Sequence, residues 1–91
     1  MNSRLRRQSD EVITAWITKR VLITGLVEVV KGTVCHNISS NMISYGRMNS
    51  AHGNDWHRTS VAAMARAEEM RLNKIAALKK QLEKLERMVF K

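Results

Sequence analysis

The chain has 91 residues, a formal net charge of +8 and a sequence pI near 10.4. A chain of this length forms one small domain with a thin core, and its single cysteine excludes an internal disulfide. The absence of proline and the presence of only four glycines argue against a disordered linker. The basic balance favours acidic partners, namely nucleic acid, an anionic membrane face or an acidic protein.

The apolar stretch after the basic start is interrupted by Lys19, Arg20 and Glu28, so it matches neither a secretory signal nor a membrane span. We therefore expect a cytoplasmic protein.

Residues 1–9 are predicted to be a basic disordered tail, and residues 10–91 a single domain. At the start of this domain, a short helix could be capped by Ser9, Asp10 and Glu11. Its apolar side would hold Val12, Ile13, Trp16 and Ile17. The alternative is a strand, since Val, Ile, Thr and Trp also favour strands.

Residues 18–58 are predicted to form a small antiparallel sheet of about three strands. The segment from Arg20 to Val34 is rich in β-branched residues, with Gly25 at a bend. Lys31 and Gly32 fit a tight hairpin turn. The remaining segments are predicted, in order, as a polar loop, a strand and a connection: residues 36–41, 42–48 and 49–55.

One long helix is predicted over residues 60–88, because this run lacks glycine and proline and is dominated by strong helix formers. The expected fold is therefore α+β, with part of the helix packed on one sheet face.

From residue 75 onward the helix carries a strict apolar heptad, a seam made of Ile75, Leu78, Leu82 and Leu85. Such a helix is longer than three short strands can cover. The seam is therefore predicted to pair with another helix, from a partner or from a second copy in a homodimer. The alternative is that it folds back on its own sheet.

The segment GNDWHRTS, residues 53–60, joins the two parts and begins with turn residues. Trp56 is expected to pack between the sheet and the first helical turns, near Val61 or Met64. Thr59 or Ser60 is expected to cap the helix. A second interpretation makes a partner-binding surface patch from Trp56, His57 and Arg58.

Catalysis and metal binding find little support. The four residues of zinc-ligand type match no common spacing: Cys35, His36, His52 and His57. A nucleophile and base could be drawn from Cys35 with His36, or from Ser60 with His57 and Asp55. Adjacent strand residues point to opposite faces, however. We expect no enzyme activity, no cofactor and no metal.

The helix also carries basic residues interleaved with Glu83 and Glu86: Lys79, Lys80, Lys84 and Arg87. Mixed signs beside a leucine seam are typical of a solvated coiled-coil flank, and these residues could also bind a partner. The alternative function is a small nucleic-acid-binding protein. In it, the lysines of the helix would hold phosphates together with Arg4, Arg6 and Arg7 of the N-terminal tail.

Four stretches carry a resemblance: DWHRT at 55–59, AMARAEEMR at 63–71, KIAALKKQLEKLE at 74–86 and ITKR at 17–20. Together they resemble a group of small, mostly uncharacterised bacterial proteins carried on phages, plasmids and other mobile elements. The resemblance implies a mobile-element accessory protein, of the kind that inhibits or modulates a host complex, as anti-CRISPR proteins do. It implies action by covering a surface of a host protein or ribonucleoprotein complex, and it assigns no residue a role.

Overall fold

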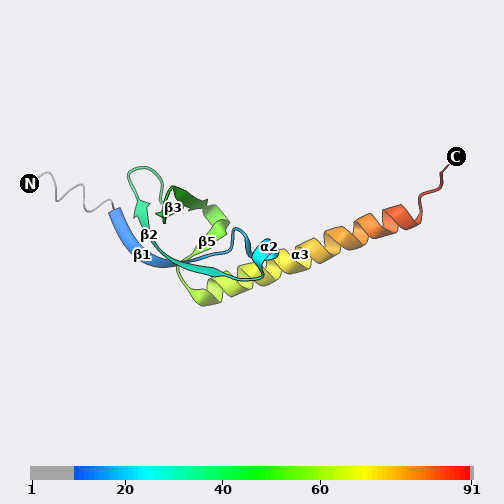
Figure 1. The fold of residues 1–91 in the computed structure, drawn as a ribbon, viewed down its shortest axis with the longest axis horizontal. Coiled ribbons are helices and arrows are strands. Elements are labelled where there is room, and N and C mark those ends of the chain that lie inside the picture. The colour runs from blue at the N-terminus through cyan, green and yellow to red at the C-terminus, as the bar shows by residue number, and fades with distance from the viewer. Residues whose placement is uncertain (1–9, 91) are drawn as a thin grey trace, which may run out of the picture.

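A computed structural model describes residues 10–90 of the chain. It shows a curved antiparallel sheet, shaped as a half-barrel, from which one long helix extends (Figure 1). The α+β class is confirmed, but the sheet has five strands instead of about three, in the order β4-β3-β2-β1-β5. The strands are β1 (Asp10–Ile17), β2 (Glu28–Cys35), β3 (Met42–Tyr45), β4 (Asn49–His52) and β5 (Trp56–His57). The tail predicted over residues 1–9 lies outside the described residues.

Strand β1 occupies the segment for which a short helix and a strand are the alternatives, so the strand is confirmed and the helix is wrong. The sheet begins at Asp10 instead of residue 18. Its alternate residues Ile13, Ala15 and Ile17 point toward the core. The strand pairs with β2 along its whole length, from Asp10 opposite Cys35 to Ile17 opposite Glu28. This pairing satisfies the backbone groups that a helix would have bonded internally.

The connection between β1 and β2 contains α2 (Val21–Thr24), a single helical turn, where continuous strand was predicted. Val21, the first residue of α2, is buried, and Gly25 ends the turn with a φ of 74°. The Gly25 N–H donates to the Val21 carbonyl at 2.8 Å. A left-handed residue at this position closes a helical turn and is best tolerated as glycine.

Lys31 and Gly32 lie in the middle of β2, so the hairpin turn predicted there is wrong. Gly32 is buried and pairs with Tyr45 of β3. A Cβ at Gly32 would lie 2.7 Å from Ile43 Cδ1. The glycine therefore allows β3 to pass close to β2, because its missing side chain leaves room for a core isoleucine.

Strands β3 and β4 form a short hairpin around the turn at residues 46–48, so the strand predicted over 42–48 ends at Tyr45. The predicted connection at 49–55 divides into β4 and the 3-10 turn η1 (Gly53–Asp55). Ala51 is the fully buried residue of β4. A strand that buries one small side chain has no recognisable alternation, so its composition resembles that of a loop.

The core lies inside the curve of the sheet, and every strand contributes to it: Ala15, Ile17, Val34, Ile43, Ala51 and Trp56. Trp56 therefore packs in the core of the half-barrel. The residues expected against it, Val61 and Met64, are exposed, so the ring does not depend on them for its burial.

Helix α3 (Ser60–Glu86) starts where it was predicted and ends two residues earlier. Thr59 caps it by accepting a hydrogen bond from the Ala62 N–H at 3.2 Å. Ala63 is its fully buried residue, and the half-buried residues of its first turns are Arg66, Ala67 and Met70. These turns contact α2, β1 and β5, so part of the helix does pack on the domain.

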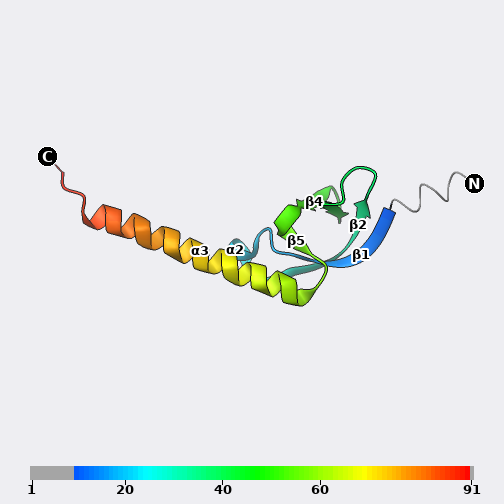
Figure 2. The ribbon, with the colours of Figure 1, turned by 180° about the vertical axis from the view of Figure 1, so that it is seen from behind.

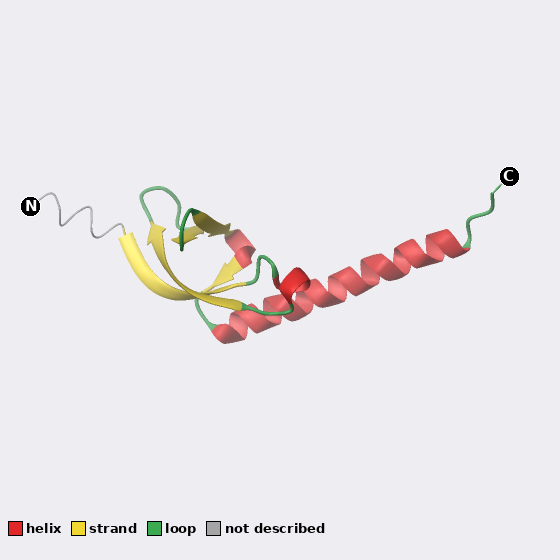
Figure 3. Ribbon diagram, viewed as in Figure 1, coloured by secondary structure: helices red, strands yellow, loops and turns green. Residues whose placement is uncertain are grey.

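Beyond Met70 the helix leaves the half-barrel (Figures 2 and 3). Every residue from 71 to 90 is exposed, and the molecule measures 74 × 27 × 20 Å. The alternative in which the seam folds back on its own sheet is therefore wrong. Neither helix among the described residues combines the length and the apolar character needed to cross a membrane.

Candidate interaction surface

Residues 71–86 of α3 form what we call the helical arm. The seam runs along it, with exposed fractions from 37% at Ile75 to 62% at Leu85. At about 100° per residue, these four side chains fall within one quarter of the helix circumference. The arm therefore presents a continuous apolar stripe, and no described residue outside α3 covers it.

The basic residues of the arm do not share one face. Lys80, Lys84 and Arg87, the residue that follows the arm, lie about 140–180° from the centre of the seam at about 100° per residue, whereas Lys79 flanks it. Glu83 lies on the basic face and pairs with Arg87 at 3.8 Å. The arm is thus apolar on one side and mainly basic on the other.

On the side of α3 that carries the seam, the turns before Ile75 are covered by α2. A groove of about 350 Å³ lies between them, lined on α2 and its cap by Val21, Leu22 and Gly25 and on α3 by Met64, Ala67, Glu68 and Arg71. The Arg71 guanidinium donates to both Glu68 carboxylate oxygens, at 2.8 and 2.6 Å. The covered region therefore ends at an ion pair, one turn before Ile75.

The predicted patch of Trp56, His57 and Arg58 is only partly available for binding. Trp56 is 8% exposed, and its Nε1–H donates to the Asn41 carbonyl at 2.9 Å. The Arg58 guanidinium stacks 5.4 Å from the Trp56 ring centroid and donates to both carboxylate oxygens of Glu11, at 2.8 and 3.0 Å. Arg58 thus connects the end of the sheet to β1.

His57 is half-buried, and its Nε2 lies 3.1 Å from the hydroxyl of Thr18, which is fully buried. That hydroxyl also donates to the Asn54 carbonyl at 3.3 Å. Burial, with a smaller contribution from the nearby Arg66, lowers the pKa of His57. Thr18 therefore fastens η1 to the end of β1, and its hydroxyl also holds the His57 ring, so neither Ser60 nor Asp55 is needed to orient the histidine.

One cluster has no counterpart in the sequence analysis. Glu11 accepts from Arg58 and also lies 2.9 Å from His36 Nε2, while His36 Nδ1 lies 3.0 Å from the Ser40 hydroxyl. The hydrogen bonds from Arg58 and then His36 lower the pKa of Glu11 to about 2. The partners of Glu11 come from segments 25 and 47 residues away, so local sequence spacing held no signal for this cluster.

The serine, imidazole and carboxylate are connected as in a nucleophile relay, but the arrangement favours a structural role. A carboxylate that already accepts two N–H groups from arginine is a weak support for an imidazolium. All three residues are at least partly exposed, and Ser40 lies in a surface loop. The cluster therefore holds the loop at 36–41 and Arg58 against β1.

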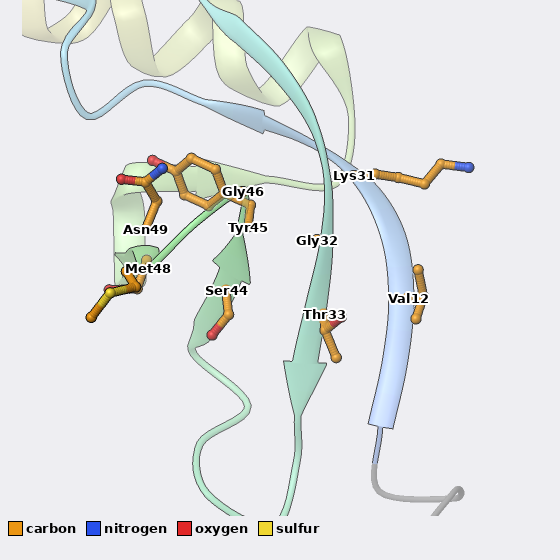
Figure 4. A pocket seen from close by; sticks show the side chains of 10 residues that line it. Val12, Lys31, Gly32, Thr33, Ser44, Tyr45, Gly46, Met48 and Asn49 are labelled. Atoms are coloured by element: carbon orange, nitrogen blue, oxygen red, sulfur yellow. The ribbon is translucent and has the colours of Figure 1, made fainter.

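The remaining candidates lie apart from one another. Within residues 10–90, no three His, Cys, Asp or Glu residues are placed to hold a metal ion. A hydrogen bond to the carboxylate of the neighbouring Asp10 raises the pKa of the Cys35 thiol, and His52 Nε2 lies 3.4 Å from the Ser50 hydroxyl. An open hollow of about 610 Å³ spans β1 to β4, and Figure 4 shows Tyr45 and Asn49 on one side of it and Lys31 on the other.

The fold and the surface together define the structural class of the protein: a small α+β half-barrel whose helical arm has an apolar face and a basic face. No protein-family model, curated protein or solved structure matches the chain.

Proposed function

We propose that the protein is a non-enzymatic binding module that acts by covering a surface of a larger host protein or ribonucleoprotein complex. The observation that carries this proposal is the helical arm, whose residues are all exposed and whose apolar and basic faces lie on opposite sides. A helix with an apolar stripe is a common recognition element, because it can insert into a groove of its partner. The inhibitor role implied by the resemblance is part of the proposal.

The basic face suits an acidic surface. Among the described residues, neither Lys80 nor Lys84 forms an ion pair, and Lys79 forms none either. Exposed lysines of this kind speed up and orient the encounter with an oppositely charged partner. We expect them to select the partner, while apolar contacts hold it.

Nucleic acid is the competing partner, since the net charge of +8 attracts phosphates as well. The salt dependence of binding distinguishes a nucleic-acid partner from a protein partner. Binding through several phosphates should weaken by about 10³-fold or more between 50 and 200 mM salt. An interface with an apolar centre should weaken much less.

The test is capture from a bacterial lysate by the immobilised chain, with and without nuclease, at both salt concentrations. We expect one defined protein or complex to be retained at 200 mM salt after nuclease treatment. The double variant Lys80→Glu/Lys84→Glu should lose it. A matched variant on the half-barrel, Lys31→Glu/Arg47→Glu, should retain it. Capture that disappears with nuclease or at 200 mM salt would instead establish nucleic acid as the partner.

A further inference from the structure

We infer that the seam is covered by a second copy of this chain, running antiparallel to the first. The inference rests on the proposed use of the helical arm as a binding element and names the partner of its apolar face. The basic face, on the opposite side, stays exposed in such a pair and remains available to the host complex.

The seam is complementary to itself in one register. In an antiparallel pair, the first core position of the heptad packs against the second core position of the other helix. Ile75 then meets Leu85 of the second copy, and Leu78 meets its Leu82. Each of the four seam residues has a seam residue opposite, so neither helix leaves one uncovered.

The length of the available surface fits this register. The seam's side of α3 is occupied by α2 as far as Arg71, and the helix ends at Glu86. An antiparallel copy in this register places its Glu86 opposite Lys74 of the first. The helix of the second copy therefore ends just before it would reach α2.

Two further exposed apolar groups come together in the same arrangement. Residues 88–90 follow the helix and are apolar, and Phe90 is 88% exposed. In the antiparallel register they lie beside α2 of the other copy and the turn that follows it, where Leu22, Ile23 and Leu26 are exposed. A seam of two heptads is short for a stable pair, and this contact, made at both ends, extends it.

A parallel pair fits less well. It would place both α2 turns at the same level on the seam side, where each obstructs the other. It would also set Lys74 of each helix against Lys79 of the other, two like-charged contacts. The antiparallel pair has one such contact, between the two Lys79 residues, and places Gln81 opposite Gln81.

The sign of the salt effect follows from the charges. Each copy carries +8, so charge repulsion opposes pairing while apolar contact favours it. Salt screens the repulsion. We therefore expect self-association to strengthen between 50 and 300 mM salt, which is the opposite of phosphate binding.

The first measurement is sedimentation equilibrium of the full chain up to 200 µM, at both salt concentrations. We expect a monomer–dimer equilibrium, weakened at least tenfold by Leu78→Lys. The control Asn73→Lys adds the same charge on the opposite face and should dimerise like the parent. Both substitutions lie on the helical arm, so circular dichroism should show the half-barrel still folded.

The orientation is tested by disulfide trapping. Two single-cysteine variants, Leu78→Cys and Leu82→Cys, are made in a Cys35→Ser background, mixed and mildly oxidised. Antiparallel pairing predicts a mixed disulfide between the two variants, because these positions face each other; parallel pairing predicts each variant linked to itself. Predominant self-linked products overturn the orientation.

A chain that stays monomeric at 200 µM in both salts overturns the inference of a second copy. That result would leave the proposed function intact if the lysate capture still depends on Lys80 and Lys84. Loss of that capture alone would contradict the proposed function and not the dimer.

Discussion

At the scale of single residues, Trp56 is the largest side chain in the core cluster of the half-barrel. Its ring is buried in the core cluster and its Nε1–H is bonded to Asn41. Trp56→Ala should cost about 3–5 kcal/mol, a large share of the roughly 5–10 kcal/mol that a domain of this size has. The measurement is urea unfolding followed by far-UV circular dichroism.

Trp56→Phe is the matched control, since it retains most of the ring packing and loses the hydrogen bond, at about 1 kcal/mol. If Trp56→Ala unfolds at the same urea concentration as the parent but no longer captures the host partner, the ring is a binding anchor and its core role is wrong.

Glu11 should contribute to the acid sensitivity of the fold. Its pKa is about 2 in the folded chain against an ordinary value of 4.5, so the unfolded chain takes up a proton first as the pH falls. Its stabilising contribution is therefore complete above about pH 4.5 and is lost as the pH falls through 2.

We expect the free energy of unfolding of the parent to fall more steeply between pH 5 and 2 than that of Glu11→Gln. The measurement is denaturant unfolding at a series of pH values. Parallel pH profiles for the two proteins would show that the contacts of Glu11 with Arg58 and His36 do not contribute in solution.

At the scale of elements, the start of α3 depends on one hydroxyl. Thr59 accepts from the Ala62 N–H, which is one of the amides that the first helical turn leaves unsatisfied. Thr59→Ala should lower the free energy of unfolding by about 1 kcal/mol. Ser60→Ala, one residue later, should change it little, and equal losses in both variants would contradict the assignment of the cap.

The helix could be predicted from the sequence, whereas most of the sheet could not. Helix propensity adds up over the 27 residues of α3. The heptad spacing of the seam also fits the period of a helix. The strands are short, and some bury one small residue, such as Ala51 in β4. In β1, the spacing of Val12, Ile13, Trp16 and Ile17 resembles one face of a helix, and only pairing with β2 decides against it.

The candidate site divides along the same line. The seam lies on the predicted helix, and its position, like that of the basic face, follows from helical periodicity. Glu11, His36 and Ser40 are brought together by strand pairing and a loop, so no local pattern marks them. Arg58 was expected on an accessible patch, yet its bonds to Glu11 depend on the same pairing.

At the scale of the whole molecule, the chain is elongated. Its radius of gyration is 18.7 Å, against about 12 Å for a compact domain of this length. The excess arises from the helical arm, whose residues are all exposed. The structure thus separates a folded body, residues 10–70, from an arm whose surface is available for partners.

This separation predicts that the arm can be removed without unfolding the body. A chain ending at Lys74 lacks the seam but keeps the half-buried residues Arg66, Ala67 and Met70 of α3. Under conditions in which the full chain is monomeric, it should unfold within about 0.5 kcal/mol of the parent, since exposed residues contribute little to stability. A chain ending at Arg66 loses Ala67 and Met70 and should be clearly less stable. The measurement is urea unfolding of all three chains, with small-angle scattering to confirm that the chain ending at Lys74 is compact. If that chain is instead as unstable as the shorter one, the arm supports the body, and the division between a structural half and a binding half of α3 is wrong.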